Sequence, residues 1–483
     1  MENESQEGTF KRELGLLDAT MLVAGSMIGS GIFIVSADIV RQVGSAGWLI
    51  MIWVLTGFFT VIAAVSYGEL SAMFPKAGGQ YVYLKEAYNK PIAFLYGWSF
   101  FSVIQTGSIA AVGVAFSKFA AYLYEPLSDA NVLWQLRTET SEYFSLNTAQ
   151  IVSIVTIVFL TYLNSRGIKD SKILQNFLTI IKVLSLVGLI ILGFTQGAKA
   201  EIWNVNWLDA WTLKSMNVEN GSWMTIGGSV VFSAISASLV GSLFSSDAWN
   251  GVTFIAGEIK KPERNVGLSL LLGTSIVSVI YVLANLMYLA VIPMNDIANA
   301  ESDRVAVVAA QNIFGHTGTI IIALMIMIST FACNNGMIMA GPRVYYIMAK
   351  DDLFFKKAGR LNKAGVPAWA SWIQCLWASV LCLTGKYGTL LDFLMIIVVF
   401  FHVLTIAGIF ILRRKLPDAE RPYRAFGYPV LPLLYIIFST IFCVSLFITK
   451  MSTCGWGVVI MLAGIPLYYL IKKKDTICDS PIK

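Results

Sequence analysis

Long runs of apolar residues, separated by short polar segments, dominate this sequence. A helix that crosses a bilayer needs about 20 predominantly apolar residues, and runs near that length recur from end to end. They lie near 15–41, 46–73, 92–124, 148–163, 174–196, 223–257, 265–292, 318–342, 368–385, 388–411, 429–448 and 455–471. The pattern predicts an all-α polytopic membrane protein with about twelve transmembrane helices.

Composition supports a membrane location and narrows the function. Of 483 residues, 56% are hydrophobic and 13% are charged, and the mean hydropathy is +0.69. Soluble domains carry about 25% charged residues. The sequence contains no hydrolase nucleophile elbow, phosphate-binding loop or nucleotide fingerprint. We therefore expect neither an enzyme nor an ATP-driven pump.

The chain offers few ligands for a metal. It has 6 cysteines and 2 histidines, and no two cysteines form a C-x-x-C pair. We expect no metal site and no cofactor. His402 stands alone in the run 388–411, where a hydrogen-bonded interior histidine is the expected role.

The positive charges predict the orientation. Most Lys and Arg residues fall in alternate loops, at 1–14, 74–91, 164–173, 258–264, 343–367, 412–428 and 472–483. The opposite loops contain only Arg41, Arg137, Lys199, Lys214, Arg304, Lys386 and Lys450. By the positive-inside rule, the basic side is cytoplasmic. We expect a multi-pass protein of the cell membrane with both termini in the cytoplasm, and no nucleic-acid partner, because the basic residues are scattered.

The first run contains an unusual segment, GSMIGSGIF at 25–33. Each glycine inside a helix costs about 1 kcal/mol relative to alanine, and unpaired backbone in hydrocarbon costs several kcal/mol per group. Such a break is tolerated where it lines a cavity, and secondary transporters use broken helices to bind substrate near the bilayer midplane. The structural alternative is close helix packing through small residues.

A second break is predicted in the sixth run, at FSSDAWNG (244–251). An Asp near mid-membrane costs about 2.5–3.5 kcal/mol on insertion scales, so Asp247 needs a partner or a function. Five runs separate the two breaks. Paired interruptions at corresponding positions of two halves indicate an inverted repeat with the substrate between them.

Four segments carry a resemblance to a known family. GSMIGSGIF (25–33), YGELSAMFPKAGGQYVYL (67–84), LFSSDAWNGVTFIAGEIKKPERN (243–265) and STFACNNGMIMAGPRVYYIMAKD (329–351) resemble amino acid–polyamine–organocation transporters, and within them the bacterial L-type amino acid exchangers. The resemblance covers nearly the whole chain. It implies a five-plus-five inverted repeat with broken helices 1 and 6, followed by two further helices.

The implied organisation assigns each part of the chain. A ten-helix core would span 15–412, with repeats at 15–196 and 223–412, and two additional helices would lie within 429–472. Residues 1–14 and 473–483 would form cytoplasmic segments.

The resemblance also implies the substrate site. The unwound stretch that takes the substrate carboxylate would be Ser26, Met27, Ile28, Gly29, Ser30 and Gly31. Phe244, Ser245 and Asp247 would supply backbone carbonyls to the α-ammonium, Phe244 would close over the substrate as an aromatic gate, and Asn250 would lie beside it. Free N–H groups at a helix start suit a carboxylate.

These residues predict secondary-active transport by alternating access, with small or medium neutral amino acids as substrates. Many relatives carry Gly at position 247, so Asp247 leaves cationic amino acids or polyamines as an alternative. Proton-coupled symport is the other alternative.

Lys182 lies about 12 Å deep in the fifth run, at 1.5 Å per residue, which is long for a lysine that snorkels to the interface. In the resembling family a lysine here occupies the region where sodium-coupled relatives hold a cation. This implies sodium independence. Lys118, near the end of the third run, is expected to snorkel.

Two acidic residues are candidates for gates. Glu69 ends the second run and Glu258 follows the sixth; ordinary interfacial charge is the alternative role for both. Animal exchangers of the resembling family link to a glycoprotein through a cysteine between helices three and four. The loop 125–147 contains no Cys, so no disulfide-linked heavy chain is expected.

Overall fold

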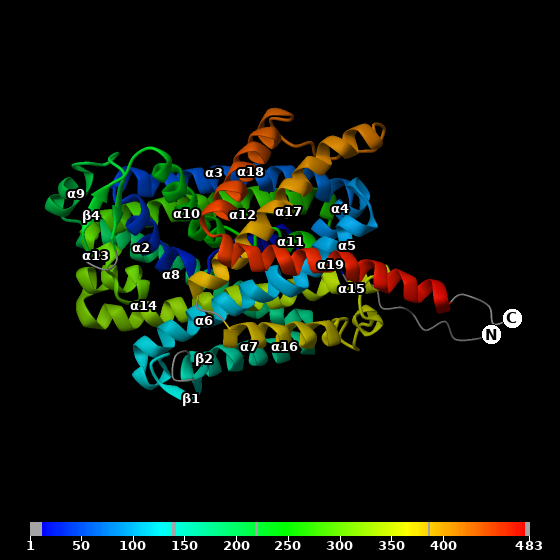
Figure 1. Ribbon diagram of the computed structural model, residues 1–483, viewed down its shortest axis with the longest axis horizontal. Helices are drawn as coiled ribbons and strands as arrows, with labels where there is room; N and C mark the ends of the chain where they lie inside the picture. The colour runs from blue at the N-terminus through cyan, green and yellow to red at the C-terminus, as the bar shows by residue number, and fades with distance from the viewer. Residues whose placement is uncertain (1–11, 138–141, 218–220, 385–386, 479–483) are drawn as a thin grey trace.

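The computed structural model describes residues 12–137, 142–217, 221–384 and 387–478. Most helices run side by side along the long axis of the molecule (Figure 1). Nine described helices are long and apolar enough to cross a membrane, and α1 (Leu16–Met27) and α2 (Gly31–Val43) together form one further span, bent by 41°. Two shorter apolar helices, Val230–Ser245 and Ala368–Leu383, lie in the sixth and ninth predicted runs. The all-α polytopic fold is confirmed, and the count of twelve stays a prediction.

Most long helices follow the predicted runs. Their bounds are α3 Ala46–Met73, α5 Lys90–Ser99, α6 Gln105–Leu123, α7 Thr148–Arg166, α8 Ile168–Leu192, α10 Ser229–Ser245, α12 Pro262–Val291, α14 Val305–Ala340, α16 Ala368–Thr384, α17 Tyr387–Lys415, α18 Val430–Thr449 and α19 Met451–Cys478. However, α8 begins before the run 174–196, and α14 begins before the run 318–342 and contains a non-helical residue, Gly315. A π-helical segment, Phe100–Ile104, joins α5 to α6, and another, Gly193–Gly197, follows α8.

Short elements connect these helices. They are α4 (Gln80–Ala87), α9 (Ala200–Trp207), α13 (Met294–Ala298), α15 (Pro342–Lys350) and two antiparallel hairpins, β1 (Val132–Arg137) with β2 (Glu142–Asn147) and β3 (Lys214–Met216) with β4 (Trp223–Thr225). The sixth predicted run therefore began too early, since residues 223–225 pair with β3 and the helix begins only at Ser229.

Burial separates central spans from peripheral ones. In the span Lys90–Leu123, 83% of the most apolar stretch is buried, against 33% in α18 and 28% in α19. Apolar side chains that a helix cannot bury against protein are suited to lipid. The α5–α6 span therefore belongs to the interior, and α18 and α19 lie at the periphery.

The molecule has two ends, which we name by their residues. The N-terminal face carries Leu14, Glu69, Glu258, Arg343 and Arg413, which are joined through the contacts described below. The vestibule face lies at the opposite ends of the helices and carries Arg41, Lys118, Asp303, Asp392 and Lys450. The helix α3 runs from the vestibule face to the N-terminal face.

Candidate substrate site

The first break separates α1 from α2 at residues 28–30. Ile28 leaves the helical region with φ −72° and ψ 88°, and α2 starts anew at Gly31. The first N–H groups of any helix lack acceptors within that helix. Gly29 and Gly31 thus stand at the positive end of α2, and Ser26, Met27, Ile28 and Ser30 are buried beside them.

The last carbonyls of α1 are capped by side chains from three other helices. Lys182 Nζ on α8 donates to Gly25 O and, at 2.7 Å, to Ile28 O. Cys333 Sγ on α14 donates to Ser26 O at 2.9 Å, and Ser329 Oγ on α14 donates to Ile28 O at 3.1 Å. Tyr281 OH on α12 lies 2.9 Å from Met27 O. The C-terminal carbonyls that have no partner within α1 therefore receive donors from α8, α12 and α14.

Lys182, which the sequence predicts to be a mid-membrane ammonium, is 1% exposed. Among the described residues its hydrogen bonds go to backbone carbonyls of the first break, and no carboxylate forms an ion pair with it. A buried ammonium held by carbonyl oxygens occupies the kind of oxygen cage that would suit a small cation.

The second break follows α10 at Ser246–Asn250, after which α11 (Gly251–Phe254) begins. Ala248 adopts φ 63°, the left-handed region that a non-glycine residue rarely visits. Asp247 N donates to Phe244 O at 3.1 Å, and Gly251 N donates to Ala248 O at 3.2 Å. The chain therefore forms two tight turns here instead of continuing the helix.

The two breaks touch each other. A Cβ added to Gly31 would lie 1.8 Å from Ser245 Oγ, so only glycine permits this approach. The Tyr281 hydroxyl lies 3.0 Å from Ser245 O as well as 2.9 Å from Met27 O, and so it joins both breaks. Gly31 therefore serves close helix packing, the structural alternative, at the place where the two breaks meet.

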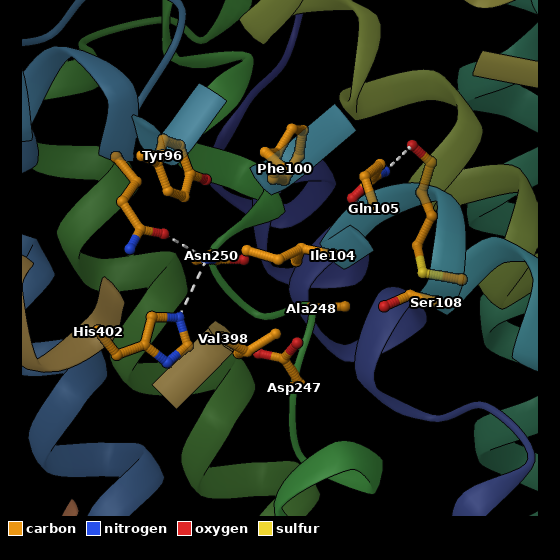
Figure 2. A pocket seen from close by; sticks show the side chains of 12 residues that line it. Tyr96, Phe100, Ile104, Gln105, Ser108, Asp247, Ala248, Asn250, Val398 and His402 are labelled. Atoms are coloured by element: carbon orange, nitrogen blue, oxygen red, sulfur yellow. Dashed lines mark hydrogen bonds between the residues drawn. The ribbon is translucent and has the colours of Figure 1, made fainter. Parts of the chain in front are cut away.

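A cavity of about 20 Å³ lies beside the second break (Figure 2). Its lining residues are Gln80, Tyr96, Phe100, Ile104, Gln105, Ser108, Asp247, Ala248, Asn250, Met337, Val398 and His402. Asn250 Nδ2 donates to Gln80 Oε1 at 3.3 Å and lies 3.3 Å from His402 Nε2. His402 has a polar partner, as expected, but it also lines this cavity, which the sequence did not indicate.

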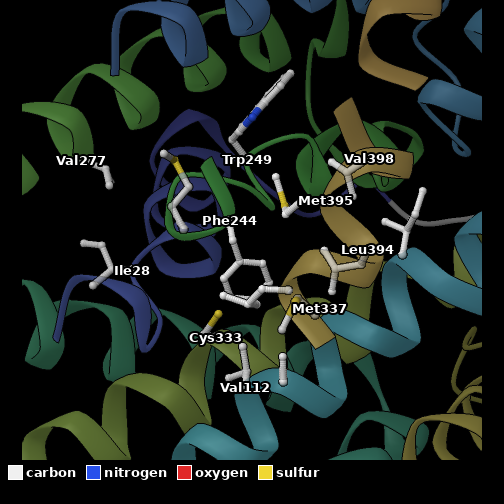
Figure 3. Close-up of a cluster of buried hydrophobic side chains, with 14 of the residues drawn as sticks. Ile28, Val112, Phe244, Trp249, Val277, Cys333, Met337, Leu394, Met395 and Val398 are labelled. Carbon is white, nitrogen blue, oxygen red and sulfur yellow. The ribbon is translucent and has the colours of Figure 1, made fainter. Parts of the chain in front are cut away.

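Phe244 lies in a buried apolar cluster, and near neighbours of it line two cavities. Figure 3 shows its ring among Cys333, Met337 and Leu394. Met337 also lines the small cavity. Val240, one turn before Phe244 on α10, lines a cavity of about 1000 Å³ that opens on the vestibule face. The position fits the predicted aromatic gate.

The predicted gate residues Glu69 and Glu258 lie in separate clusters on the N-terminal face. Glu258 accepts from Arg343 Nε at 3.0 Å, and both side chains are buried. Its backbone carbonyl accepts from Leu14 N at 3.0 Å, which ties the start of the described chain to the second broken helix. Glu69 is fully buried and accepts from Arg413 Nε at 2.9 Å.

The Glu69 cluster extends into the loop between α17 and α18. Ala425 N donates to Glu69 Oε2 at 2.7 Å, and Arg413 stacks on Tyr428 with its Cζ 3.6 Å from the ring centroid. Burial, followed by the negative charge of Glu69, raises the pKa of Tyr423 in this loop. Neither glutamate contacts the two breaks directly in the hydrogen bonds described.

Sequence reasoning missed several residues of the site. Tyr281, Ser329 and Cys333 each cap a carbonyl of the first break. In the sequence, these residues are distinguished only by a polar group inside an apolar run. Many residues with a purely structural role have the same feature. Lys118 was expected to snorkel, which stays a prediction. Its side chain lines the large cavity, 4.0 Å from Asp303.

Comparison with known proteins identifies the family. A family model described as amino acid permease matches residues 14–470. The chain belongs to the amino acid permease family. This permease is therefore a membrane transporter and not an enzyme, and the predicted membership of the amino acid–polyamine–organocation superfamily is confirmed.

Three relatives illustrate the similarity. The permease is 28% identical over 473 residues to the serine/threonine exchanger SteT of Bacillus subtilis, covering 97% of this chain and 99% of that protein. It is 26% identical over 461 residues to the large neutral amino acids transporter small subunit 2 of Homo sapiens, covering 95% and 80%. It is 26% identical over 467 residues to the Asc-type amino acid transporter 1 of Mus musculus, covering 96% and 82%. Amino acid transport is common to all three names.

Proposed function

We propose that this permease is a secondary-active exchanger of small or medium neutral amino acids that works by alternating access without sodium. The observation that carries the proposal is the meeting of the two breaks at Gly31 and Ser245. There the start of α2 presents backbone N–H groups to a carboxylate, while the end of α10 presents carbonyls to an ammonium. An α-amino acid carries both groups.

Two of the three proposed carbonyl ligands already have a donor. Phe244 O accepts from Asp247 N, and Ser245 O lies 3.0 Å from the Tyr281 hydroxyl. A carbonyl oxygen has two lone pairs and can accept a second hydrogen bond. The substrate ammonium can therefore bind without breaking the contacts that hold the second break.

Lys182 supports the proposal that transport is independent of sodium. Its ammonium donates to Gly25 O and Ile28 O, and Ser329 Oγ reaches the same carbonyl of Ile28. A fixed positive charge at these oxygens leaves no need for a metal cation there, and it links α8 to the first break. Exchange driven by a counter-substrate then needs no ion gradient.

The cavities describe one state of the proposed cycle. The cavity of about 1000 Å³ opens on the vestibule face, whereas the buried pair of Glu258 and Arg343 closes the N-terminal face. Alternating access requires groups that pair in one state and separate in another. We propose Glu258 and Glu69 as such groups, with Phe244 gating the path from the vestibule.

The positive-inside rule supports a cytoplasmic N-terminal face, which contains most of the basic loops. We also propose the predicted domain plan, in which 15–196 and 223–412 are inverted repeats. The absence of Cys from 125–147 supports a carrier that needs no disulfide-linked heavy chain. The mass of the purified protein, measured with and without reductant, tests this proposal. We expect the same mass in both conditions.

One observation favours a second candidate function. Asp247 lines the small cavity at the second break, so a substrate with an extra positive charge would meet a carboxylate. Cationic amino acids are therefore the second candidate. A substrate that carries no side-chain charge leaves Asp247 to hold the loop or bind a proton.

Counterflow in proteoliposomes tests the function. Vesicles loaded with unlabelled L-serine, L-alanine, L-leucine or L-lysine are given the labelled amino acid outside, in sodium or in choline buffer. We expect saturable, trans-stimulated uptake of neutral amino acids at equal rates in both buffers. A sodium requirement, or preference for L-lysine, contradicts the proposal, and accumulation driven only by a pH gradient establishes proton symport instead.

A further inference from the structure

The amide of Asn250 is held by side chains from two other helices (Figure 2). Its Nδ2 donates to Gln80 Oε1 of α4 at 3.3 Å and lies 3.3 Å from His402 Nε2 of α17. All three side chains are buried, and all three line the small cavity at the second break. The amide therefore has one orientation, provided that the donors and acceptors around it can be assigned.

The assignment starts from Thr405, one turn after Phe401 on α17. The Thr405 hydroxyl has a single hydrogen, which it donates to Phe401 O at 2.8 Å. It can therefore only accept from Gln80 Nε2, which lies 3.0 Å away. This directs Gln80 Oε1 toward Asn250, so the group of Asn250 that faces it must be the NH2 group.

His402 is then an acceptor. The amide nitrogen of Asn250 offers only hydrogens, so the His402 Nε2 that faces it carries none. The imidazole is neutral, with its hydrogen on Nδ1. Two rings hold it in place: the centroid of Tyr67 lies 5.8 Å from that of His402 in an edge arrangement, and that of Trp249 lies 5.3 Å away.

One atom of the Asn250 side chain remains for a ligand. Gln80 and His402 engage both hydrogens of Nδ2, whereas Oδ1 accepts no hydrogen bond from any described residue. The backbone at this point is also fixed, because Thr253 Oγ1 donates to Asn250 O at 2.7 Å. If the two acceptors were lost, the amide could turn over and offer its NH2 group in place of Oδ1.

We propose that His402 and Gln80 are positioning residues, which hold Asn250 Oδ1 as the acceptor for a donor group of the substrate. The inference rests on the proposed function, since the donor belongs to the transported amino acid. That donor is the α-ammonium or a side-chain hydroxyl. The cavity of about 20 Å³ is sufficient for a group about the size of one water molecule.

Loss of either acceptor should weaken substrate binding and leave the turnover of the carrier unchanged. One neutral hydrogen bond corresponds to about a 2–10-fold change in affinity. His402→Phe and Gln80→Met should therefore raise KM in counterflow by about 2–10-fold. His402→Gln should stay close to the unaltered protein, because a glutamine Oε1 replaces the imidazole nitrogen as acceptor.

A double-mutant cycle tests whether His402 acts through Asn250. Asn250→Ala removes the acceptor itself, so His402→Phe should raise KM no further in that background. The full chain is assayed in proteoliposomes with L-serine and with L-alanine, and Tm is measured for each variant. Gln80→Met tests the same orientation from α4 if His402→Phe does not fold. His316→Phe is the matched control, because His316 is the other of the 2 histidines and is exposed.

Nuclear magnetic resonance tests the hydrogen-bond assignment directly. In His316→Phe, labelled with nitrogen-labelled histidine, the imidazole signals belong to His402. We expect a hydrogen on Nδ1 and none on Nε2. A hydrogen on Nε2 overturns the inference, whatever the transport assays show.

The transport outcomes separate positioning from a structural role. A rise in KM for His402→Phe and Gln80→Met, with a smaller effect of His402→Gln and a non-additive cycle, supports the inference. A rise for both substrates identifies the α-ammonium as the donor, and a rise for L-serine alone identifies the hydroxyl.

Contrary outcomes are equally clear. Unchanged KM in both acceptor variants overturns the inference. So does an additive effect in the Asn250→Ala background, or a fall in Tm and saturated rate at constant KM, because His402 would then only support the fold. If the unaltered protein exchanges no neutral amino acid, the proposed function fails, and the resonance measurement still tests the orientation of Asn250.

Discussion

Replacement of Lys182 by methionine separates its contribution to stability from its contribution to transport. Methionine has a similar length and helix propensity, so α8 should form as before. The change removes the hydrogen bonds to Gly25 O and Ile28 O. Ile28 O keeps the Ser329 hydroxyl at 3.1 Å, whereas Gly25 O loses its donor from Lys182. The link between α8 and the first break disappears.

The two contributions to stability oppose each other. Hydrogen bonds to a charged group contribute about 1.5–3 kcal/mol each. Against this, burying an ammonium costs several kcal/mol after relaxation, and Lys182 is 1% exposed. The free energy of unfolding should therefore change little. Transport should fall about 10–150-fold, which corresponds to the loss of one charged hydrogen bond from the transport-competent state.

Two assays on the same preparation check this prediction. Thermal unfolding in detergent reports stability, and counterflow in proteoliposomes reports transport, with Lys199→Met as the control for loss of an exposed lysine. We expect Tm to stay within a few degrees while the exchange rate falls. Normal exchange by Lys182→Met refutes the role of the ammonium, and a collapse of Tm shows that the residue is needed for folding instead.

Three further changes test other parts of the site. Phe244→Ala should raise KM or reduce turnover in counterflow, because an aromatic lid excludes water and commits the substrate. Gly31→Ala should reduce exchange strongly, since its Cβ would lie 1.8 Å from Ser245 Oγ and overpacking costs about 1–3 kcal/mol; adding Ser245→Gly should restore part of the activity. Glu258→Gln should open the N-terminal face, because loss of one partner from a buried ion pair costs about 3–5 kcal/mol, and hydrogen exchange at the amide of Leu14 should become faster.

Each of these predictions has a contrary result. Unaltered kinetics of Phe244→Ala would mean that another residue separates the two cavities. If Ser245→Gly does not improve Gly31→Ala, then Gly31 serves the ligand and not the packing of α2 on α10. Unchanged exchange at Leu14 in Glu258→Gln would show that the pair with Arg343 does not hold the N-terminal face closed.

The sequence alone determined the approximate location of most helices and of both breaks. Hydrophobic runs and the high cost of polar groups in hydrocarbon are local properties, which a linear sequence displays directly. The bounds of α3 agree with the predicted run 46–73, and the first break lies within 25–33. The same argument identified Lys182, because a charged side chain so far from the membrane interface is costly unless it has a partner or a function.

Only the tertiary structure decided which groups complete the site. Tyr281 is separated from Met27 by 254 residues and Ser329 from Ile28 by 301, so no local pattern connects them. Hydroxyl groups within apolar helices are common, and only their position against the end of α1 distinguishes these two. The pairing of Glu69 with Arg413 likewise depends on a distance across the bundle. Hydrogen bonds and ion pairs act over a few ångströms, whereas the hydrophobic pattern of a sequence indicates only which residues are buried away from water. Helix packing therefore decides which polar groups come into contact.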